Sequence, residues 1–383
     1  MKSGKTPKRL GWGQRLLRTS ALAVLLFTLS VGLSGAWWDF LGGGSSTPAR
    51  KSILAQGAAI TDPEAILRYS LPIDNPTVRE LQGSLEDISY HLRKKLWSSV
   101  NRDVRTASRI LNISAEKLLA TVPEERQSPA REHLQQMSQE MVTLKEAVDA
   151  KDPEQITSLK DGILHQVTDL EELMVPGFPF AVPEEYAHLP QLLGRATVVM
   201  TTTKGDLKIV VDGYSAPVNG GNFVDLVQRG FYDGLPFIDI EESFVLQTGK
   251  PPGKEQGFID PDTGEYRAVP LEVLIQGDSE PIYGITLEDA GFYLEQPALP
   301  FNAYGAVAMA RPGSDPNGGS SQFFFFKFDT ELTPPGYNLM DGRYSVFGYL
   351  VQGKEVLQQL TDQDKVITAQ VVKGIENLVQ PQA

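Results

Sequence analysis

The sequence contains no cysteine among its 383 residues. It therefore has no disulfide, no thiolate nucleophile and no zinc site of the cysteine type, which suits an exported protein. Histidine is almost as scarce, and the C-terminal half of the chain has none for base or metal chemistry. We expect neither a metal nor a cofactor. The four histidines are His91, His133, His165 and His188.

Positive charge exceeds negative charge at the N-terminus, whereas acids outnumber cations in the rest of the chain. The net charge is −13, and residues 1–36 contribute six cations and no acid, so the remaining chain carries −13 − 6 = −19. A chain segment this acidic repels the phosphate backbones of nucleic acids and anionic lipid surfaces. We therefore expect no nucleic-acid partner.

Long apolar runs are also scarce, and the one at residues 21–33 directly follows these cations. The run is short for a spanning helix and precedes a small-x-small site, so we predict a signal peptide over residues 1–36 and export of the protein. The alternative is an uncleaved anchor, with Trp37 and Trp38 at the membrane interface. The Gly-rich residues 37–61 predict a flexible linker.

Residues 62–174 show the periodicity of amphipathic helices. Asn75-Pro76, Ser128-Pro129 and Asp152-Pro153 each combine a capping side chain with a first-turn proline, and apolar residues follow at spacings of three and four. The first pattern predicts a helix that continues through Leu96 to Leu111. Helices with single apolar stripes must bury them, so we predict an all-α helical bundle. A docking or dimerisation surface is the alternative, since the stripe of the second helix also matches heptads.

The pattern changes after the helices. Closely spaced prolines cannot continue a helix, so residues 175–195 predict an extended linker, on which Phe178 and Phe180 could dock against a domain. From Ala196 the apolar period is two, and Lys204-Gly205 separates two strand patterns in the manner of a hairpin. Pro217 then begins a further helix.

Four consecutive phenylalanines follow a Gly/Ser turn at residues 318–321. Side chains alternate between the two faces of a strand, so Phe323 to Phe326 predict a central strand that is buried on both faces. Gln322 shares a face with Phe324 and Phe326. By itself this run indicates a core strand with one capping glutamine.

Several motifs surround this strand in a fixed order. In their order and spacing they resemble the cyclophilin family of peptidyl-prolyl isomerases, over roughly residues 196–378. The resemblance implies that residues 196–383 form a closed eight-stranded antiparallel β-barrel capped by two helices, downstream of the bundle. The motifs are Lys204-Gly205-Asp206-Leu207, Ala216-Pro217-Val218-Asn219, Phe231-Tyr232-Asp233-Gly234, Phe244-Val245-Leu246-Gln247-Thr248-Gly249, Ile282-Tyr283-Gly284, Gly305 to Ala310, and Asp341 to Gly348.

The resemblance also implies a groove that binds proline-containing protein segments. Leu339 and Tyr344 stand where the family has tryptophan and histidine, which alters the groove rim. Inherited core packing is the alternative interpretation of this set. The implied substrate-binding residues are Phe244, Gln247, Ala310, Gln322, Phe324, Leu339, Met340, Tyr344 and Phe347.

Catalysis in the family depends on an arginine that donates to the prolyl nitrogen as the amide twists over its high barrier. That arginine corresponds to Asp239 here, in an alignment without gaps from Phe237 to Phe244. Loss of one such donor costs roughly 3 kcal/mol, or about a hundredfold in rate. We expect weak or lost isomerase activity, and Arg311, which stands where the family has asparagine, is a candidate replacement cation.

Residues 251–281, which we call the insert, are about twenty residues longer than the usual family connection. Its Asp260-Pro261-Asp262-Thr263-Gly264 string predicts a turn, since the remaining oxygen ligands of a calcium loop are missing. The insert, the acidic body and the exported helical region resemble the thylakoid-lumen multidomain cyclophilins of cyanobacteria and chloroplasts. That subgroup is implicated in assembly and maintenance of photosystem II.

The functional prediction follows from this resemblance. We expect an exported cyclophilin-family protein of the thylakoid lumen or periplasm that acts mainly as a proline-binding folding and assembly chaperone for photosystem II subunits. The alternative is a fully active peptidyl-prolyl cis-trans isomerase, and a weaker third hypothesis is a dimerising scaffold. We also expect the helical bundle to dock on the barrel and to limit access to the groove.

Overall fold

The computed structural model describes residues 60–240, 244–261, 263–293, 295–328 and 338–381. The predicted signal peptide and nearly all of the linker over residues 37–61 lie outside the described residues. Within the described part of the chain, no helix is both long enough and apolar enough to span a membrane.

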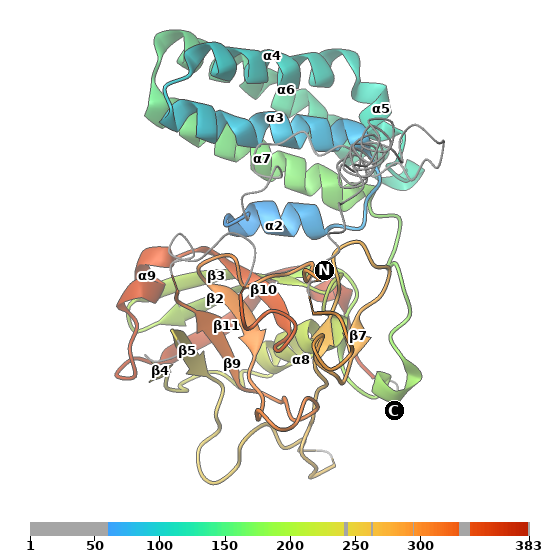
Figure 1. The fold of residues 1–383 in the computed structure, drawn as a ribbon, viewed down its shortest axis with the longest axis vertical. Coiled ribbons are helices and arrows are strands. Elements are labelled where there is room, and N and C mark those ends of the chain that lie inside the picture. The colour runs from blue at the N-terminus through green and yellow to red at the C-terminus, as the bar shows by residue number, and fades with distance from the viewer. Residues whose placement is uncertain (1–59, 241–243, 262, 294, 329–337, 382–383) are drawn as a thin grey trace, which may run out of the picture. The chain divides into compact units, whose positions relative to one another are not determined.

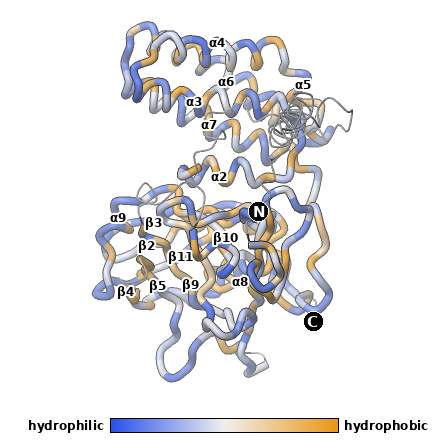
Figure 2. Tube along the Cα trace, in the orientation of Figure 1, coloured by the Kyte–Doolittle hydropathy of each residue, from blue (hydrophilic) through white to orange (hydrophobic). Residues whose placement is uncertain are grey.

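The N-terminal part of the described chain is helical. Its four longer helices, α3, α4, α6 and α7, run side by side (Figure 1). Their apolar stripes face one another, and Leu81, Met137, Leu144 and Ile163 are completely buried. Figure 2 shows the corresponding alternation of apolar and polar residues along these helices. The helices are α2 (Pro63–Ser70), α3 (Pro76–Arg93), α4 (Trp97–Ile113), α5 (Ala115–Leu119), α6 (Gln127–Ala150) and α7 (Pro153–Met174).

Two of the three predicted helix starts have the expected caps. The Asn75 side chain accepts hydrogen bonds from the backbone N–H groups of Thr77 and Val78, at 3.1 and 3.0 Å. Asp152 does the same at the start of α7. The third predicted start, at Ser128-Pro129, differs in detail, because α6 begins one residue earlier at Gln127 and has no side-chain cap. The prolines occupy first-turn positions, where the missing N–H costs no helical hydrogen bond.

The predicted continuation of the first helix to Leu111 is wrong. The chain breaks after Arg93, where Lys95 has a φ of 55°, and α4 starts at Trp97. The N–H of Leu96 donates to the carbonyl of His91, which is the closing hydrogen bond of a Schellman-type helix end. The left-handed residue turns the chain back, so one expected helix is a hairpin of two.

The C-terminal part is built on one antiparallel sheet of eight strands, in the order β11-β2-β3-β10-β8-β9-β5-β4. The hairpin predicted at Lys204-Gly205 is confirmed, since β2 and β3 pair along their whole length. Two short pairs, β1 with β12 and β6 with β7, lie outside this sheet. The strands are β1 (Gln191–Leu192), β2 (Arg195–Thr202), β3 (Gly205–Asp212), β4 (Ile238–Ile240), β5 (Val245–Thr248), β6 (Glu272–Val273), β7 (Ile282–Tyr283), β8 (Ala306–Met309), β9 (Phe323–Phe326), β10 (Val346–Gln352), β11 (Val366–Lys373) and β12 (Leu378–Val379).

The sheet is curled but is not the closed eight-stranded barrel that we expected. Its edge strands, β11 and β4, are not neighbours in the sheet, and the bridge between Pro236 and Lys365 lies beside this gap. Three backbone hydrogen bonds join residues 234–237 to residues 364–366 at this gap. Pro236 has no N–H to donate, and no continuous ladder joins β4 to β11. Helices α8 (Pro217–Gln228) and α9 (Lys354–Gln359) accompany the sheet, and α8 begins at the predicted proline.

The four phenylalanines of β9 divide between two apolar clusters, as the alternation predicted. Phe323 and Phe325 join the main core together with Phe223 of α8. Phe324 and Phe326 lie in a second cluster, which also contains Ile66 and Leu67 of α2. The strand is therefore buried on both faces, and the second cluster contains the candidate site.

The linker over residues 175–195 packs against other segments through its aromatic residues. Phe178 contacts Phe180 at 4.7 Å and Tyr214 at 6.2 Å between ring centroids. Tyr186 contacts Tyr283 of β7 at 5.2 Å. Docking of Phe178, which we predicted, is therefore observed at Tyr214, which follows β3.

Candidate functional site

The candidate site is organised by two neighbouring strands, β5 and β9. Gln247 lies directly opposite Phe324, and Ala308 of β8 lies opposite Phe324 on the other side. Residues opposite one another in an antiparallel pair share a face of the sheet. We use the term groove face for this side of the sheet, which carries Gln247, Phe324 and, from the loops, Tyr344.

Phe324 forms the centre of the groove face, but its ring is almost completely covered, at 3 % exposed. The Tyr344 ring meets it edge-on at 5.5 Å, and the Phe301 ring stacks in parallel with it at 6.0 Å. The sequence did not predict the role of Phe301, because it lies in a loop without periodicity. The aromatic floor is therefore assembled from three segments that are far apart in sequence.

Other predicted residues surround this floor. Phe244 is about half exposed, at 51 %, and has a φ of 52°, and its ring contacts Phe328 at 4.8 Å. Ala310 and Met340 pack at the edge of the cluster. Leu339 is 83 % exposed, so its side chain lies at the rim and does not fill a pocket.

Phe347 is the one predicted residue with a described side chain that points away from the groove face. It is completely buried in the main core, where its ring lies 5.1 Å from that of Phe223. Its neighbour Val346 belongs instead to the cluster around Phe324. The reason is the strand alternation of β10, which gives adjacent residues opposite faces.

Two glutamines of the groove face contact each other and the insert. The Gln247 amide nitrogen donates to the Gln322 amide oxygen at 2.7 Å. The Gln322 amide nitrogen donates to the backbone carbonyl of Gln256 at 2.5 Å. The insert therefore reaches the polar end of the groove face directly.

The position of the family arginine lies on β4, the strand that pairs with β5. The backbone of Asp239 pairs with Leu246 in the ladder of β4 and β5, next to Gln247. The structure describes only the backbone of Asp239, and residues 241–243 lie outside the described residues. The consequence of an acid at this position stays a prediction.

Arg311 lies at the rim and is engaged with backbone carbonyls. Its Nε and Nη2 atoms donate to the Arg343 carbonyl at 3.0 and 2.7 Å, and Nη1 donates to Pro312 at 3.0 Å. The guanidinium lies 5.2 Å from the centre of the Tyr344 ring. This cation is near the groove face, but its donors already have acceptors, so its role as a replacement for the arginine also stays a prediction.

Glu272 is a buried carboxylate in the insert that the sequence did not single out. It accepts hydrogen bonds from the backbone N–H groups of Val218 and Asn219, at 3.1 and 2.9 Å, at the N-terminus of α8. Its own N–H donates to the Ser345 hydroxyl at 2.7 Å, beside Tyr344. A carboxylate suits the positive end of a helix. Glu272 therefore ties the insert to both α8 and the segment that carries Tyr344.

This carboxyl should make stability depend on pH. Burial raises the pKa of Glu272 to about 6, although the N–H groups of Asn219 and Val218 oppose the shift. A carboxyl with a higher pKa in the folded state binds protons more tightly there, so it favours folding increasingly as pH falls through about 6, and this contribution is lost as pH rises. Between about pH 8 and about pH 4, we expect the unfolding free energy of the wild type to gain up to about 2 kcal/mol relative to Glu272→Gln.

Urea unfolding of the wild type and of Glu272→Gln across this pH range measures the difference in unfolding free energy. The contributions of carboxyls that both proteins share cancel in this comparison. An identical pH dependence in the two proteins would contradict the expected role of Glu272.

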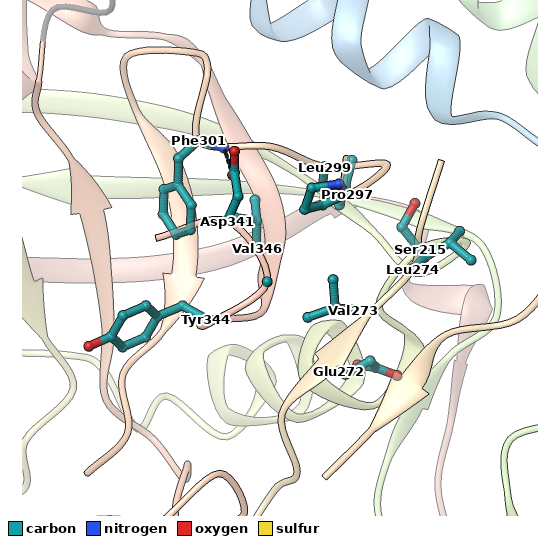
Figure 3. A pocket seen from close by; sticks show the side chains of 11 residues that line it. Ser215, Glu272, Val273, Leu274, Pro297, Leu299, Phe301, Asp341, Tyr344 and Val346 are labelled. Carbon is teal, nitrogen blue, oxygen red and sulfur yellow. Dashed lines mark hydrogen bonds between the residues drawn. The ribbon is translucent and has the colours of Figure 1, made fainter. Parts of the chain in front are cut away.

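A cavity of about 10 Å³ lies between the insert, the segment of Phe301 and the loop of Asp341. Figure 3 shows the side chains that line it. The cavity has room for about one water molecule. The Asp341 carboxylate points to the Phe301 backbone and accepts its N–H at 2.8 Å. Burial raises the pKa of Asp341 to about 6 against the effect of this hydrogen bond. Asp341 thus positions Phe301 on the aromatic floor.

A larger cavity of about 840 Å³ is lined by residues of α2, α6, α7, the linker and four strands. Its charges pair with one another: Glu64 lies 2.9 Å from His165, and Asp169 lies 3.0 Å from Lys373. These pairs neutralise much of the lining, so its chemistry does not indicate a particular ligand. Among the described residues there is also no cluster of three or more acidic or histidine side chains that could hold a metal ion.

Comparison with known proteins identifies two segments of the chain. Residues 62–175 match the family model described as peptidyl-prolyl cis-trans isomerase CYP38-like, PsbQ-like domain. Residues 197–377 match the model of cyclophilin-type peptidyl-prolyl cis-trans isomerases.

Three relatives align over most of their length. A putative thylakoid lumen peptidyl-prolyl cis-trans isomerase of Synechocystis is 60 % identical over 366 residues, which is 96 % of each chain. The chloroplastic peptidyl-prolyl cis-trans isomerase CYP38 of Arabidopsis thaliana is 44 % identical, over 86 % of this chain and 78 % of the relative. The chloroplastic CYP37 of the same plant is 32 % identical, over 83 % and 71 %.

These matches include the strands that build the groove face and the helical segment that precedes them. The chain therefore belongs to the cyclophilin-type peptidyl-prolyl cis-trans isomerase family, and its helical segment is the PsbQ-like domain of the CYP38-like members.

Proposed function

We propose that this protein is an exported, lumenal member of the family that acts mainly as a proline-binding folding and assembly chaperone, with weak or lost isomerase activity. The observation that carries the proposal is the placement of Asp239 in β4, directly beside the strand that bears Gln247. The aromatic residues that would hold a proline ring are present, whereas the position of the catalytic cation holds an acid. Such a site can bind a proline segment without stabilising the twisted amide.

The cellular context of the proposal comes from the relatives. One is named for the thylakoid lumen, and two are chloroplastic. The subgroup that the sequence resembles is implicated in photosystem II assembly, so we propose that the bound segments belong to photosystem II subunits. The predicted signal peptide agrees with export to that compartment.

Docking of the helical region next to the groove domain is a further part of the proposal. It is supported by Ile66 and Leu67 of α2, which belong to the same apolar cluster as Phe324. It is also supported by Arg195 of β2, which donates to the Leu67 carbonyl. A docked helical region would limit which segments reach the groove.

A fully active isomerase is the second candidate function. It is favoured by the arrangement of Phe324, Tyr344, Gln247 and Gln322 on one face, which matches what proline binding requires. The two candidate functions predict different rates of isomerisation, and both predict binding of proline-containing segments.

The test is the substitution Asp239→Arg in the full chain, with Asp362→Arg as a control that makes the same charge change at an exposed turn. We expect the wild type to isomerise an Ala-Pro peptide about a hundredfold more slowly than a typical cyclophilin, because it lacks the donor. Asp239→Arg should raise kcat/KM by about 10- to 100-fold, and Asp362→Arg should not change it. NMR exchange spectroscopy measures the rates.

Binding is measured in parallel with a proline peptide and its Pro→Ala analogue. The chaperone proposal requires preference for the proline peptide in all three proteins. A wild-type rate within about tenfold of a typical cyclophilin would support the active isomerase instead.

A further inference from the structure

The insert contributes a backbone carbonyl to the polar end of the groove face. The Gln256 carbonyl accepts from the Gln322 side chain at 2.5 Å, and Gln322 accepts from Gln247 at 2.7 Å. We call these three groups the amide relay. Gln247 and Gln322 are both partly exposed, so the relay borders the groove and is not sealed in the core.

The relay has only one consistent polarity. A backbone carbonyl can only accept, so the group of Gln322 that contacts it must be the amide nitrogen. The Gln322 oxygen then faces Gln247, and the Gln247 nitrogen must face that oxygen. The Gln247 oxygen is left as the acceptor at the end of the relay.

The carbonyl that sets this polarity is held firmly. A Cβ atom on Gly257 would lie 2.5 Å from the Ser320 Cβ, so the backbone of the insert lies in close contact with the turn before β9. The N–H of Phe258 donates to the Ser320 hydroxyl at 3.0 Å, and the Tyr266 hydroxyl donates to the Gly318 carbonyl at 3.2 Å. The Phe258 ring also packs under the Arg267 guanidinium, 4.5 Å from its centre.

We propose that the insert determines substrate selection, because its Gln256 carbonyl orients Gln247 to accept an N–H from the bound segment. This inference rests on the proposed function of proline binding. Gln247 lies opposite Phe324, so the acceptor adjoins the position of the proline ring. Proline has no N–H, so the donor is the peptide N–H of a residue near the proline. The groove therefore selects segments in which the backbone nitrogen of that neighbouring residue carries a hydrogen. It discriminates against Pro-Pro runs, in which the neighbouring residue is itself a proline without an N–H.

The decisive variant is Gly257→Ala in the full chain, because the added methyl group must displace the insert from Ser320. The matched control is Gln256→Ala. It removes an exposed side chain that bonds only within the insert, at Lys254, and it keeps the backbone carbonyl. A second test variant, Gln322→Leu, breaks the relay from the other side without altering the insert.

The first measurement needs no ligand. NMR of the deuterated protein detects scalar coupling across the hydrogen bond between the Gln322 side-chain nitrogen and the Gln256 carbonyl carbon. We expect this coupling in the wild type and in Gln256→Ala, and we expect its loss in Gly257→Ala. Absence of the coupling in the wild type would overturn the relay.

The second measurement is the affinity for Ser-Ala-Ala-Pro-Ala-Ser and for analogues that each carry one N-methyl group. In the wild type and in Gln256→Ala, we expect one N-methyl position to weaken binding by about 3- to 10-fold, because one hydrogen bond is lost. In Gly257→Ala and Gln322→Leu this penalty should fall below about twofold.

A penalty that is unchanged in both relay variants would overturn the inference. Equal binding of the Pro→Ala peptide would instead overturn the proposed function together with the selection built on it. In that case an intact coupling between Gln322 and Gln256 would locate the failure in the function and not in the relay.

Discussion

Replacing Asp212 with alanine is expected to lower the free energy of opening of the β2–β3 hairpin by about 3–5 kcal/mol. Asp212 is completely buried at the end of β3. Its carboxylate accepts from Arg195 at 2.9 Å and from the Ser70 hydroxyl of α2 at 2.6 Å. The other oxygen accepts from the backbone N–H groups of Tyr214 and Ser215, at 2.9 and 3.3 Å.

The large effect follows from what the substitution leaves behind. Arg195 is only 7 % exposed, and without Asp212 its guanidinium would keep Glu172, at 3.4 Å, as its ion-pair partner. A buried charge that loses its main partner costs far more than an exposed one, because water cannot replace the interaction. Asp212→Ala should therefore also loosen α2, which the same carboxylate holds through Ser70.

Native-state hydrogen exchange of the amides in β2 and β3 measures this free energy. The control is Lys204→Ala on the same hairpin, where an exposed lysine lies 3.8 Å from Asp364. That variant should cost less than about 1 kcal/mol, since exposed ion pairs contribute little. Similar losses in the two variants would show that the Asp212 network does not stabilise the hairpin as inferred.

Replacing Phe323 with alanine should cost about 3–5 kcal/mol of unfolding free energy and should leave peptide affinity nearly unchanged in the folded protein. Its ring is completely buried and meets the rings of Phe223 at 4.9 Å and Tyr232 at 5.3 Å. Removing it leaves a cavity between α8 and the sheet, away from the groove face. Urea unfolding and calorimetric titration with the proline peptide give the two quantities.

The adjacent residue provides the comparison. Phe324→Ala removes a ring of the same size from the same strand, but this ring forms the floor of the groove face with Tyr344 and Phe301. It should weaken binding of the proline peptide by about 10- to 100-fold, because the Tyr344 and Phe301 rings that border the groove lose the ring on which they pack. Unchanged affinity in Phe324→Ala would mean that proline does not bind at this face.

Local sequence signals predicted several elements correctly because their physical cause is local. Asn75 and Asp152 cap helices through N–H groups two and three residues away. The turn after Lys204 forms a hairpin, and the run of phenylalanines in β9 alternates between two faces as its chemistry requires. The same motifs were sufficient to indicate the family.

Other features depended on distant partners. The break at Lys95 forms because α3 and α4 pack as separate helices, although the apolar spacing of the sequence continues through it. The incomplete closure of the sheet depends on where Pro236 meets Lys365, at positions far apart in the chain. Phe347 was expected on the groove face, but the register of β10 with its neighbours gave that face to Val346.

The sequence by itself determined the family and several local elements, because these follow from periodicity, capping and motifs within short segments. Only the tertiary structure decided that Phe301 covers Phe324, that Glu272 joins the insert to α8, and that the Gln256 carbonyl orients Gln322 and Gln247. The physical reason is that each of these contacts joins groups from segments far apart in the chain. Their geometry is fixed only when the sheet and the insert pack together, and no local pattern records which distant partner a side chain will meet.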